Sequence, residues 1–383
     1  RSSDLSIRGS VFMKAVAMLL LVIAMPMEAL LRNNLEYWGG KAITRIQEDW
    51  ETHPLTVFFR LVHYLGSEYV LLVGISVFYH IGNPISAIKI GVVSSTAQYI
   101  HSIINLIYCE PRPYWVYGHI KALDCSKGFG NPSPQVVTLA VFCFYSTNEY
   151  IKNKTVKTAA FVAICVLLVL MSIAEMYLGD YFPHQIAVSL ALSYIFIVVC
   201  IAFEDRLQSL VHKSSFDYFR NRTSIVYWIV ATIGMLSLTV LVYSIITLQN
   251  EVLVIWIKHA TDDCNIEYQV GNSYSFFYSA FIFYQLGLVL GSMLLHKYVS
   301  NLWWRTQFWK RYIRAFLAGG IVVGLRYLFK LMPSDDFASE YTFQYCVPYF
   351  LMGIIPTLGL GFASSYMRLS YRDQVALGLI NLC

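Results

Sequence analysis

The chain has 383 residues, of which 57% are hydrophobic, 16% aromatic and only 13% charged. Soluble domains carry roughly 25% charged residues, so this composition excludes an ordinary soluble protein and predicts an integral membrane protein. The formal net charge is +5 at pH 7. This positive charge reflects where the basic residues lie relative to the membrane. It therefore gives little support to a nucleic-acid partner.

Charge-poor windows of about 20 residues, the length of a helix that crosses a bilayer, recur along the chain. The ten windows cover residues 11–31, 57–80, 86–108, 134–149, 156–175, 184–203, 225–248, 273–296, 313–332 and 346–367. They predict an all-α, polytopic transmembrane helical bundle. Lys14, Pro26 and Glu28 interrupt the first window, for which the alternative is an interfacial helix. No signal peptide is recognisable, and the start at Arg1 leaves open a missing or processed N-terminus.

Basic residues gather in alternate loops, which is typical of the cytosolic side of a membrane. The basic loops lie at 152–157, 206–222, 297–314 and 368–372, whereas the loops at 251–267 and 335–340 are acidic or mixed. This alternation predicts an even number of spans with both chain ends in the cytosol. The sequons at Asn153 and Asn221 then face the cytosol, so we expect neither to be glycosylated. The loop at 109–133 and the turn at 176–183 meet on the lumenal or external face.

Four of the eight cysteines map to the non-cytosolic side, where disulfides can form. They are Cys109, Cys125, Cys264 and Cys346. A bridge that involves Cys125 is plausible, and the sequence leaves its partner open.

Three short segments carry most of the functional information. They are residues 110–115 (EPRPYW), 128–135 (GFGNPSPQ) and 177–185 (YLGDYFPHQ). In order and spacing they resemble the motifs of the type 2 phosphatidic-acid phosphatase and vanadium haloperoxidase superfamily. The third segment resembles the glucose-6-phosphatase-like members in particular, and the four spans that follow the segments are similar, in number only, to those of the sphingosine-1-phosphate-phosphatase-like members.

The resemblance implies a lipid-phosphatase-like six-helix core at residues 57–203. An N-terminal transmembrane or interfacial helix with a lumenal linker precedes it at 1–56, and a four-helix membrane region follows at 204–383. In the family, a Lys and two Arg hold the phosphate, a Pro-Ser-Gly-His turn supplies a histidine acid, and a second histidine, supported by an Asp, is the nucleophile. Arg112 and Ser133 match this pattern.

The other family positions are substituted. Asn105 stands at the position of the Lys, Gln135 at that of the acid histidine, Glu175 at that of an Arg and Tyr181 at that of the nucleophile. Gln185 replaces the supporting Asp, although the glucose-6-phosphatase branch also has Gln there. Transfer through a phosphohistidine needs an imidazole nucleophile, an acid and fixed cations. Because losing one electrostatic donor typically costs about 100- to 1,000-fold in rate, no useful phosphatase activity is expected.

We expect structural roles for the residues that remain. Arg112 is predicted to form a buried ion pair with Glu175, and Ser133 to cap the following helix. Tyr181 is expected to fill the former catalytic pocket. His101 and Asn105, four residues apart, are expected to form interhelical hydrogen bonds. His184 belongs to the family's Phe-Pro-His-Gln segment and is not expected to replace the nucleophile.

The residues predicted to bind a ligand are Arg112, Arg326 and Lys330. Arg326 and Lys330 lie one turn apart near Asp335 and Asp336. Their default interpretation is snorkelling or pairing with those acids, and the alternative is binding of a lipid headgroup. No metal-ligand cluster, nucleotide loop or redox pair is recognisable, so the sequence predicts no metal and no cofactor.

The leading hypothesis is a catalytically inactive membrane protein that acts as a structural, lipid-binding or regulatory subunit of a membrane assembly. Its expected partners are membrane lipids and other membrane-protein subunits, without nucleic acid. The expected location is the endoplasmic reticulum or another endomembrane, with the plasma membrane or the mitochondrial inner membrane as alternatives. The competing hypothesis is a lumenal lipid-phosphate or sugar-phosphate phosphatase with a rearranged site. Translocation of a lipid or solute is a third possibility, although no broken-helix pair is recognisable in the sequence.

Overall fold

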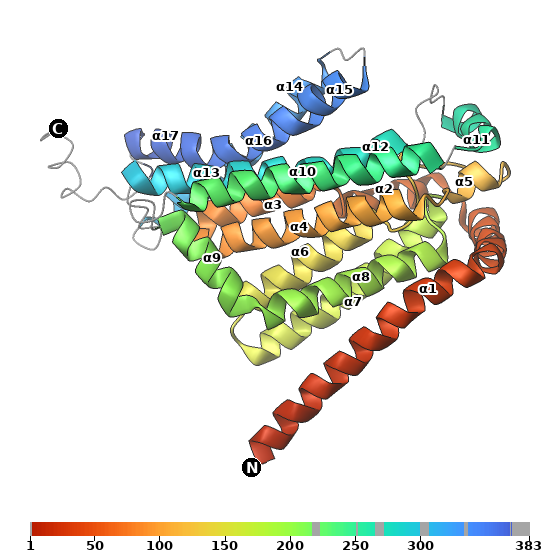
Figure 1. Ribbon diagram of the computed structural model, residues 1–383, viewed down its shortest axis with the longest axis horizontal. Coiled ribbons are helices and arrows are strands. Elements are labelled where there is room, and N and C mark those ends of the chain that lie inside the picture. The colour runs from red at the N-terminus through yellow and green to blue at the C-terminus, as the bar shows by residue number, and fades with distance from the viewer. Residues whose placement is uncertain are drawn as a thin grey trace, which may run out of the picture.

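The structure, a computed structural model, describes residues 2–216, 223–249, 252–264, 272–298, 306–332, 336–367 and 369. All regular secondary structure in these ranges is helical. Most of the helices run side by side along the long axis of the molecule (Figure 1). The predicted all-α bundle is therefore confirmed.

The first half of the chain forms eight helices. They are α1 (Ser2–Trp50), α2 (His53–Leu65), α3 (Glu68–Ile81), α4 (Pro84–Tyr108), α5 (Pro113–Val116), α6 (Pro134–Tyr150), α7 (Lys154–Tyr177) and α8 (Pro183–Ala202). Polar side chains cap several of their first turns, where backbone N–H groups lack helical partners. The side chain of Asn83 accepts from Ile85 N. Asn153, in the first sequon, accepts from the amides of Thr155 and Val156 at the start of α7.

The second half adds nine helices to the described part. They are α9 (Glu204–Phe216), α10 (Thr223–Gln249), α11 (Val254–Cys264), α12 (Asn272–Phe277), α13 (Phe281–Tyr298), α14 (Phe308–Lys330), α15 (Phe337–Glu340), α16 (Val347–Ile354) and α17 (Leu360–Tyr366). A 3-10 turn at Tyr278–Ala280 joins α12 to α13, and π-helical turns at Tyr341–Cys346 and Ile355–Gly359 join α15, α16 and α17. The second sequon, at Asn221, lies outside the described residues.

Six helical segments in the described ranges are long and apolar enough to cross a membrane. They are α7, α8, α10, α14, Tyr274–Leu295 and Phe337–Ser364. The pair α2 and α3 makes a seventh if it counts as one bent span. The predicted windows at 86–108 and 134–149 coincide with α4 and α6, which bury most of their side chains inside the bundle. The window at 11–31 lies within α1.

The predicted span at 57–80 is not one straight helix. It breaks after Leu65 into α2 and α3, which meet at an angle of 50°. Gly66 sits at the break, and a Cβ there would lie 2.6 Å from the carbonyl oxygen of Gln135. Only glycine allows this close approach of two backbones. The break places the end of α2 directly beside the start of α6.

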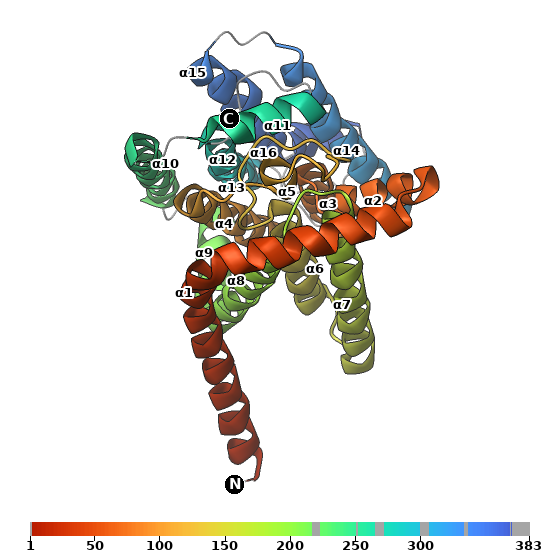
Figure 2. The ribbon, with the colours of Figure 1, turned by 90° about the vertical axis from the view of Figure 1, so that its right-hand side faces the viewer.

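Helix α1 covers one end of the bundle. Figure 2 shows that it changes direction, so that one arm leads to the N-terminus and the other crosses this end in front of the remaining helices. Gln47 anchors the crossing arm by donating from its side chain to the carbonyls of Lys121 and Tyr177. Gly39 lets the same arm approach the ring of Phe182.

The C-terminal helices pack onto α3 and α4 and share one hydrophobic cluster with them. Ile75 of α3 and Leu106 of α4 are buried in the same cluster as Phe281 of α13 and Tyr349 of α16. Gly287 and Gly353 let α13 and α16 approach closely, because a Cβ at either position would lie 2.5 Å or less from a carbonyl oxygen of the other helix. Small residues at such contacts are typical of helix packing in membranes.

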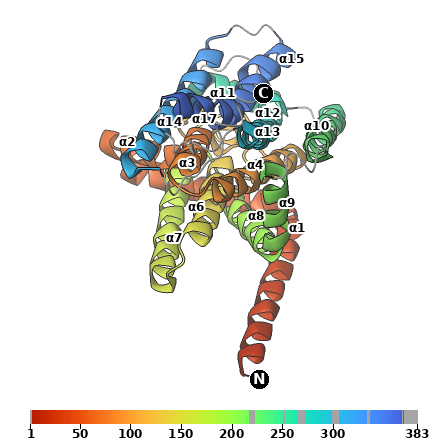
Figure 3. The same cartoon turned by 90° about the vertical axis from the view of Figure 1, so that its left-hand side faces the viewer.

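At the opposite end of the bundle, α9 lies beside α4, α8 and α13 (Figure 3). Lys89 of α4 is buried there and pairs with Glu149 at 2.6 Å and with Glu204 of α9. The buried cation is thus neutralised by carboxylates from two other helices.

A disulfide joins Cys125, in the loop after α5, to Cys264 at the end of α11. The prediction that Cys125 forms a bridge is confirmed, and the structure identifies the partner that the sequence left open. Because 139 residues separate the two cysteines, the bond fixes α11 to the loop that precedes α6. Both α5 and α11 lie at the end that the crossing arm of α1 covers (Figure 2).

Candidate functional site

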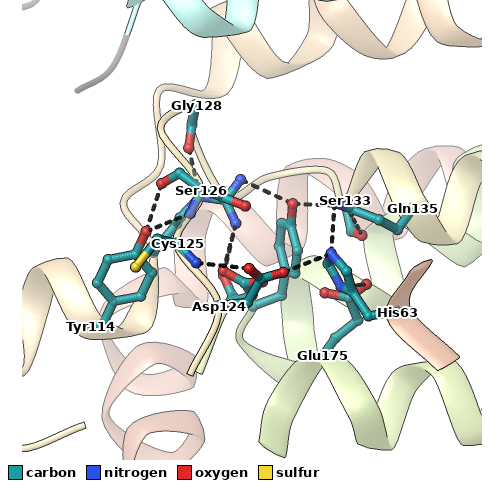
Figure 4. A network of polar contacts seen from close by, with 12 residues as sticks. His63, Tyr114, Asp124, Cys125, Ser126, Gly128, Ser133, Gln135 and Glu175 are labelled. Atoms are coloured by element: carbon teal, nitrogen blue, oxygen red, sulfur yellow. Dashed lines mark hydrogen bonds and ion pairs between the residues drawn. The ribbon is translucent and has the colours of Figure 1, made fainter. Parts of the chain in front are cut away.

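The three motif-bearing segments meet at the end of the bundle where α5 lies. The amide of Gly130 donates to the carbonyl of Glu110 at 2.8 Å, and the amide of Leu123 donates to the carbonyl of Leu178 at 3.1 Å. Arg60 of α2 also donates to the Leu123 carbonyl. The loop at 109–133 and the turn after α7 therefore form one site, and α2 closes its side (Figure 4).

Protein groups surround the guanidinium of Arg112, which the resemblance places at one of the family's cation positions. The side chain is 1% exposed. It donates to the Gly128 carbonyl at 2.6 Å and to the Tyr181 hydroxyl at 2.9 Å, and it pairs with Asp180 at 3.3 Å. Burial lowers the pKa of Arg112, but Tyr181 and Asp180 raise it above the ordinary value. The guanidinium therefore stays charged, and its N–H groups donate to acceptors of the protein itself.

The predicted ion pair between Arg112 and Glu175 is wrong. Arg112 reaches Asp180, which follows the sharp turn at the end of α7. Gly179 makes this turn with a φ of +79°, a conformation that residues with a Cβ rarely adopt. The turn carries Asp180 back toward the α7 terminus, where its amide donates to the Glu175 carbonyl. Sequence spacing could not show which of the two carboxylates the turn presents to Arg112.

Glu175 instead contacts His63, a residue that sequence reasoning missed. The Nδ1 atom of His63 lies 3.2 Å from a Glu175 oxygen, and its Nε2 atom lies 3.1 Å from a carboxylate oxygen of Asp124. Gln135 is also within 3.4 Å of Nε2. Figure 4 shows the imidazole between these groups. An available signal was the presence of an ionisable side chain inside an apolar window, which marks functional positions in membrane proteins.

Tyr181 fills the position of the family nucleophile and is fully buried. Its hydroxyl donates to Gln135 at 3.0 Å and accepts from Arg112. Burial raises its pKa well above the ordinary value, although Arg112 opposes the shift. A phenol with such a pKa is a weaker nucleophile than a free tyrosine.

Three further polar side chains hold the loop before α6 in place. Ser133 accepts from the amide of Val136 at 3.3 Å, which confirms its predicted role as a helix cap. Asn105 donates to the carbonyls of Phe129 and Asn131 at 3.2 and 3.0 Å. His101 contacts the Pro132 carbonyl at 2.8 Å. The hydrogen bonds expected of His101 and Asn105 thus go to the loop before α6, not to a neighbouring helix.

Gln185 connects the first and third segments. Its amide nitrogen donates to the Pro111 carbonyl at 3.0 Å and to the Glu110 carboxylate at 3.2 Å. Its oxygen accepts from the amide of Phe182 at 3.1 Å, which caps α8. Gln185, at the position where the resemblance implies an Asp, therefore links the first and third segments through hydrogen bonds.

The electrostatics of the site do not suit phosphate. Three carboxylates, from Asp124, Glu175 and Asp180, surround Arg112 and His63. Burial raises the pKa of Asp180 to about 7, despite the opposing effect of Arg112. Even with a partly protonated Asp180, the site offers no surplus of positive charge to an anion.

The three residues predicted to bind a ligand do not form one site. Arg326 pairs with Glu68 of α3 at 3.1 Å. The expected ion pair between Arg326 and Asp336 is therefore wrong. Asp335, the other acid considered, lies outside the described residues. The guanidinium of Arg326 also lies over the ring of Tyr345. It lines a cavity of about 260 Å³ next to Gly128. Lys330 is exposed at the last residue of α14.

Two groups of side chains could hold a metal ion, although the sequence shows no ligand motif. They are His63 with Asp124 and Asp180, and Glu28 with Glu110 and His184; within each group the donor atoms lie within 4.8 Å of one another. In the first group both ring nitrogens of His63 already face carboxylates at hydrogen-bond distance. Their members lie far apart in the chain, so sequence spacing could not reveal either group.

The fold and the site define a class: a multi-pass, all-helical membrane protein whose three loop segments converge on a buried arginine. Residues 86–209 match a family model described as the PAP2 superfamily. The chain therefore carries a PAP2-superfamily segment, as its motifs predict. No curated protein and no solved structure matches the chain.

Proposed function

We propose that this chain is a catalytically inactive PAP2-like membrane protein that acts as a structural, lipid-binding or regulatory subunit of a membrane assembly. The single observation that carries the proposal is the state of Arg112. Its guanidinium is bound by Asp180, Tyr181 and the Gly128 carbonyl, so protein groups occupy the place of the phosphate oxygens.

The site also lacks the groups that the chemistry needs. Phosphoryl transfer requires a nucleophile in line with the phosphorus and an acid for the leaving group. Tyr181 and Gln135 occupy these two family positions and bind each other at 3.0 Å. A phosphate would have to displace this hydrogen bond and approach three carboxylates, which makes binding unfavourable before any reaction begins.

Contact with membrane lipids is supported by the outer surface of the PAP2-like helices. Helices α6, α7 and α8 enclose an apolar groove of about 710 Å³, lined among others by Phe144, Phe161 and Leu190. In a bilayer the natural occupant of such a groove is an acyl chain. The disulfide suits an oxidising compartment, and we propose an endomembrane such as the endoplasmic reticulum.

One observation favours the competing proposal, a lumenal phosphatase with a rearranged site. Glu175 and His63 form a carboxylate–imidazole pair at 3.2 Å, and such a pair can orient a nucleophilic histidine. The other ring nitrogen, however, faces Asp124 at 3.1 Å. A phosphate ester would have to displace this carboxylate.

Phosphate release by the purified full chain separates the two proposals. The substrates are lysophosphatidate, sphingosine-1-phosphate and glucose-6-phosphate, and an active phosphatase of the superfamily is assayed in parallel as the positive control. We expect no release above the blank, and no change in Arg112→Ala or His63→Ala. If the wild-type chain releases phosphate and either substitution abolishes this release, the proposal of an inactive protein is refuted. The chain would then be a phosphatase with a rearranged site.

A further inference from the structure

We propose that the chain binds one divalent cation of the Zn²⁺ class between Glu28, Glu110 and His184. Glu28 lies on α1, Glu110 follows α4, and His184 lies in the first turn of α8. The cation would therefore join three elements at the end of the bundle that α1 crosses. This inference is independent of the proposed loss of phosphatase activity, because none of the three residues contacts Arg112 or Tyr181 through a hydrogen bond or ion pair in the described structure.

The spacing of the donor atoms fits a small cation. The Nε2 atom of His184 lies 3.4 Å from a Glu110 oxygen and 3.6 Å from a Glu28 oxygen. Ligands about 2.0–2.1 Å from a tetrahedral Zn²⁺ lie roughly 3.3–3.4 Å from one another. A single N–H could donate to only one of the two carboxylates. One cation can bind all three donors at once.

Two of the three ligand residues, Glu28 and His184, are buried and have few polar partners. Glu28 is 8% exposed and His184 is 7% exposed. Among the described residues, the Glu28 oxygens accept no hydrogen bond, and the Nε2 atom of His184 has the two long carboxylate contacts given above. Asn131, which is fully buried, also lies beside Glu110. Buried ionisable groups without partners are costly, and a bound cation removes this cost.

The local charge also favours a cation. Arg32 pairs with Glu110 at 2.7 Å, and the carboxyl groups of Glu28 and Glu36 also face Glu110. Three carboxyl groups thus share one arginine in this part of the described structure, an excess of acidic groups that a divalent cation would offset.

Neighbouring groups orient the central ligand and point to the kind of metal. Gln185 donates to one Glu110 oxygen at 3.2 Å, and Arg32 holds the other. Such outer contacts are typical of metal sites. One imidazole with two carboxylates suits Zn²⁺ better than Mg²⁺ or Ca²⁺, which prefer oxygen ligands alone.

The test measures Zn²⁺ binding to the full chain in detergent after chelator treatment, by metal analysis and by titration. We expect one bound Zn²⁺ per chain. Glu28→Gln and His184→Ala should each weaken binding by at least about tenfold, since even outer-shell substitutions cost 10- to 100-fold. His63→Ala, in the other candidate group, is the matched control and should leave binding unchanged.

Thermal unfolding distinguishes lost binding from misfolding. Zn²⁺ should raise the unfolding midpoint of the wild-type chain and of His63→Ala, but not that of Glu28→Gln. Glu28→Gln keeps the side-chain volume and removes a buried charge, so its metal-free midpoint should match or exceed that of the wild type. Absence of bound Zn²⁺, unchanged affinity in Glu28→Gln, or loss of binding in His63→Ala would each overturn the proposal.

Discussion

At the scale of single residues, the site where the three segments meet is held together by a buried ion pair and the hydrogen bonds around it. Arg112 is charged and almost wholly buried, and Asp180 is fully buried beside it. Asp180 and Tyr181 bind its guanidinium, so Arg112 links the loop after α4 to the turn after α7.

Arg112→Met should therefore destabilise the protein by about 3–5 kcal/mol, because it leaves the Asp180 carboxyl buried without its cation. The double variant Arg112→Met with Asp180→Asn should recover part of this loss. Unfolding midpoints of the wild type, both single variants and the double variant in detergent measure the effect.

The exposed pair Lys121–Glu51 provides the control. It has a 2.5 Å contact, but its side chains are 62% and 35% exposed. Lys121→Met should change stability by no more than about 1 kcal/mol. Equal losses for Lys121→Met and Arg112→Met would show that Arg112 has no special structural role.

At the scale of helices, close backbone contacts decide how the elements meet. Gly66 allows α2 to end against the start of α6, and this contact brings His63 to Gln135 and Glu175. The window at 57–80 indicated an apolar segment, whereas the bend inside it depends on residues about 70 positions further along the chain. A local pattern cannot contain that information.

Helices α13 and α16 offer a test of such contacts. A Cβ at Gly353 would lie 2.5 Å from the carbonyl oxygen of Tyr284. Gly353→Ala should therefore push the two helices apart and cost roughly 1–3 kcal/mol. Gly320→Ala, in α14, meets no described atom within 4 Å and should stabilise its helix by up to about 1 kcal/mol. Unfolding midpoints that shift in the same direction for both variants would contradict this packing.

At the scale of the whole molecule, a disulfide in the described part of the chain joins the loop before α6 to the C-terminal half. Cys125 precedes α6, and Cys264 ends α11. The two halves also share the cluster that contains Ile75 and Phe281. The C-terminal helices are therefore packed and cross-linked onto the helices that carry the site.

The bridge should be present in protein prepared without reductant, so that Cys125 and Cys264 react with a maleimide only after reduction. Cys264→Ser should expose Cys125 to the reagent, and it should cost about 2–5 kcal/mol because the disulfide closes a long loop. A gel-shift assay with a large maleimide measures the free thiols. Cys143→Ser, which removes a cysteine without a disulfide partner, is the control. An unchanged shift in Cys264→Ser would exclude the bridge.

The sequence by itself determined the environment, the helical class and the PAP2-like motifs. These properties depend on composition and on short local patterns, which packing does not alter. It also identified Asn105, Gln135, Glu175 and Tyr181 as departures from the family, because each lies at a fixed distance from a recognisable motif.

Only the tertiary structure decided which groups pair. In the structure, Arg112 pairs with Asp180, His63 contacts Glu175, and Cys125 forms a disulfide with Cys264. Glu28 lies beside His184. The physical reason is that ion pairs, disulfides and ligand groups depend on distances between side chains from separate elements. Turns and helix contacts set those distances. A single glycine that allows a sharp turn or a close backbone contact, such as Gly179 or Gly66, can change them.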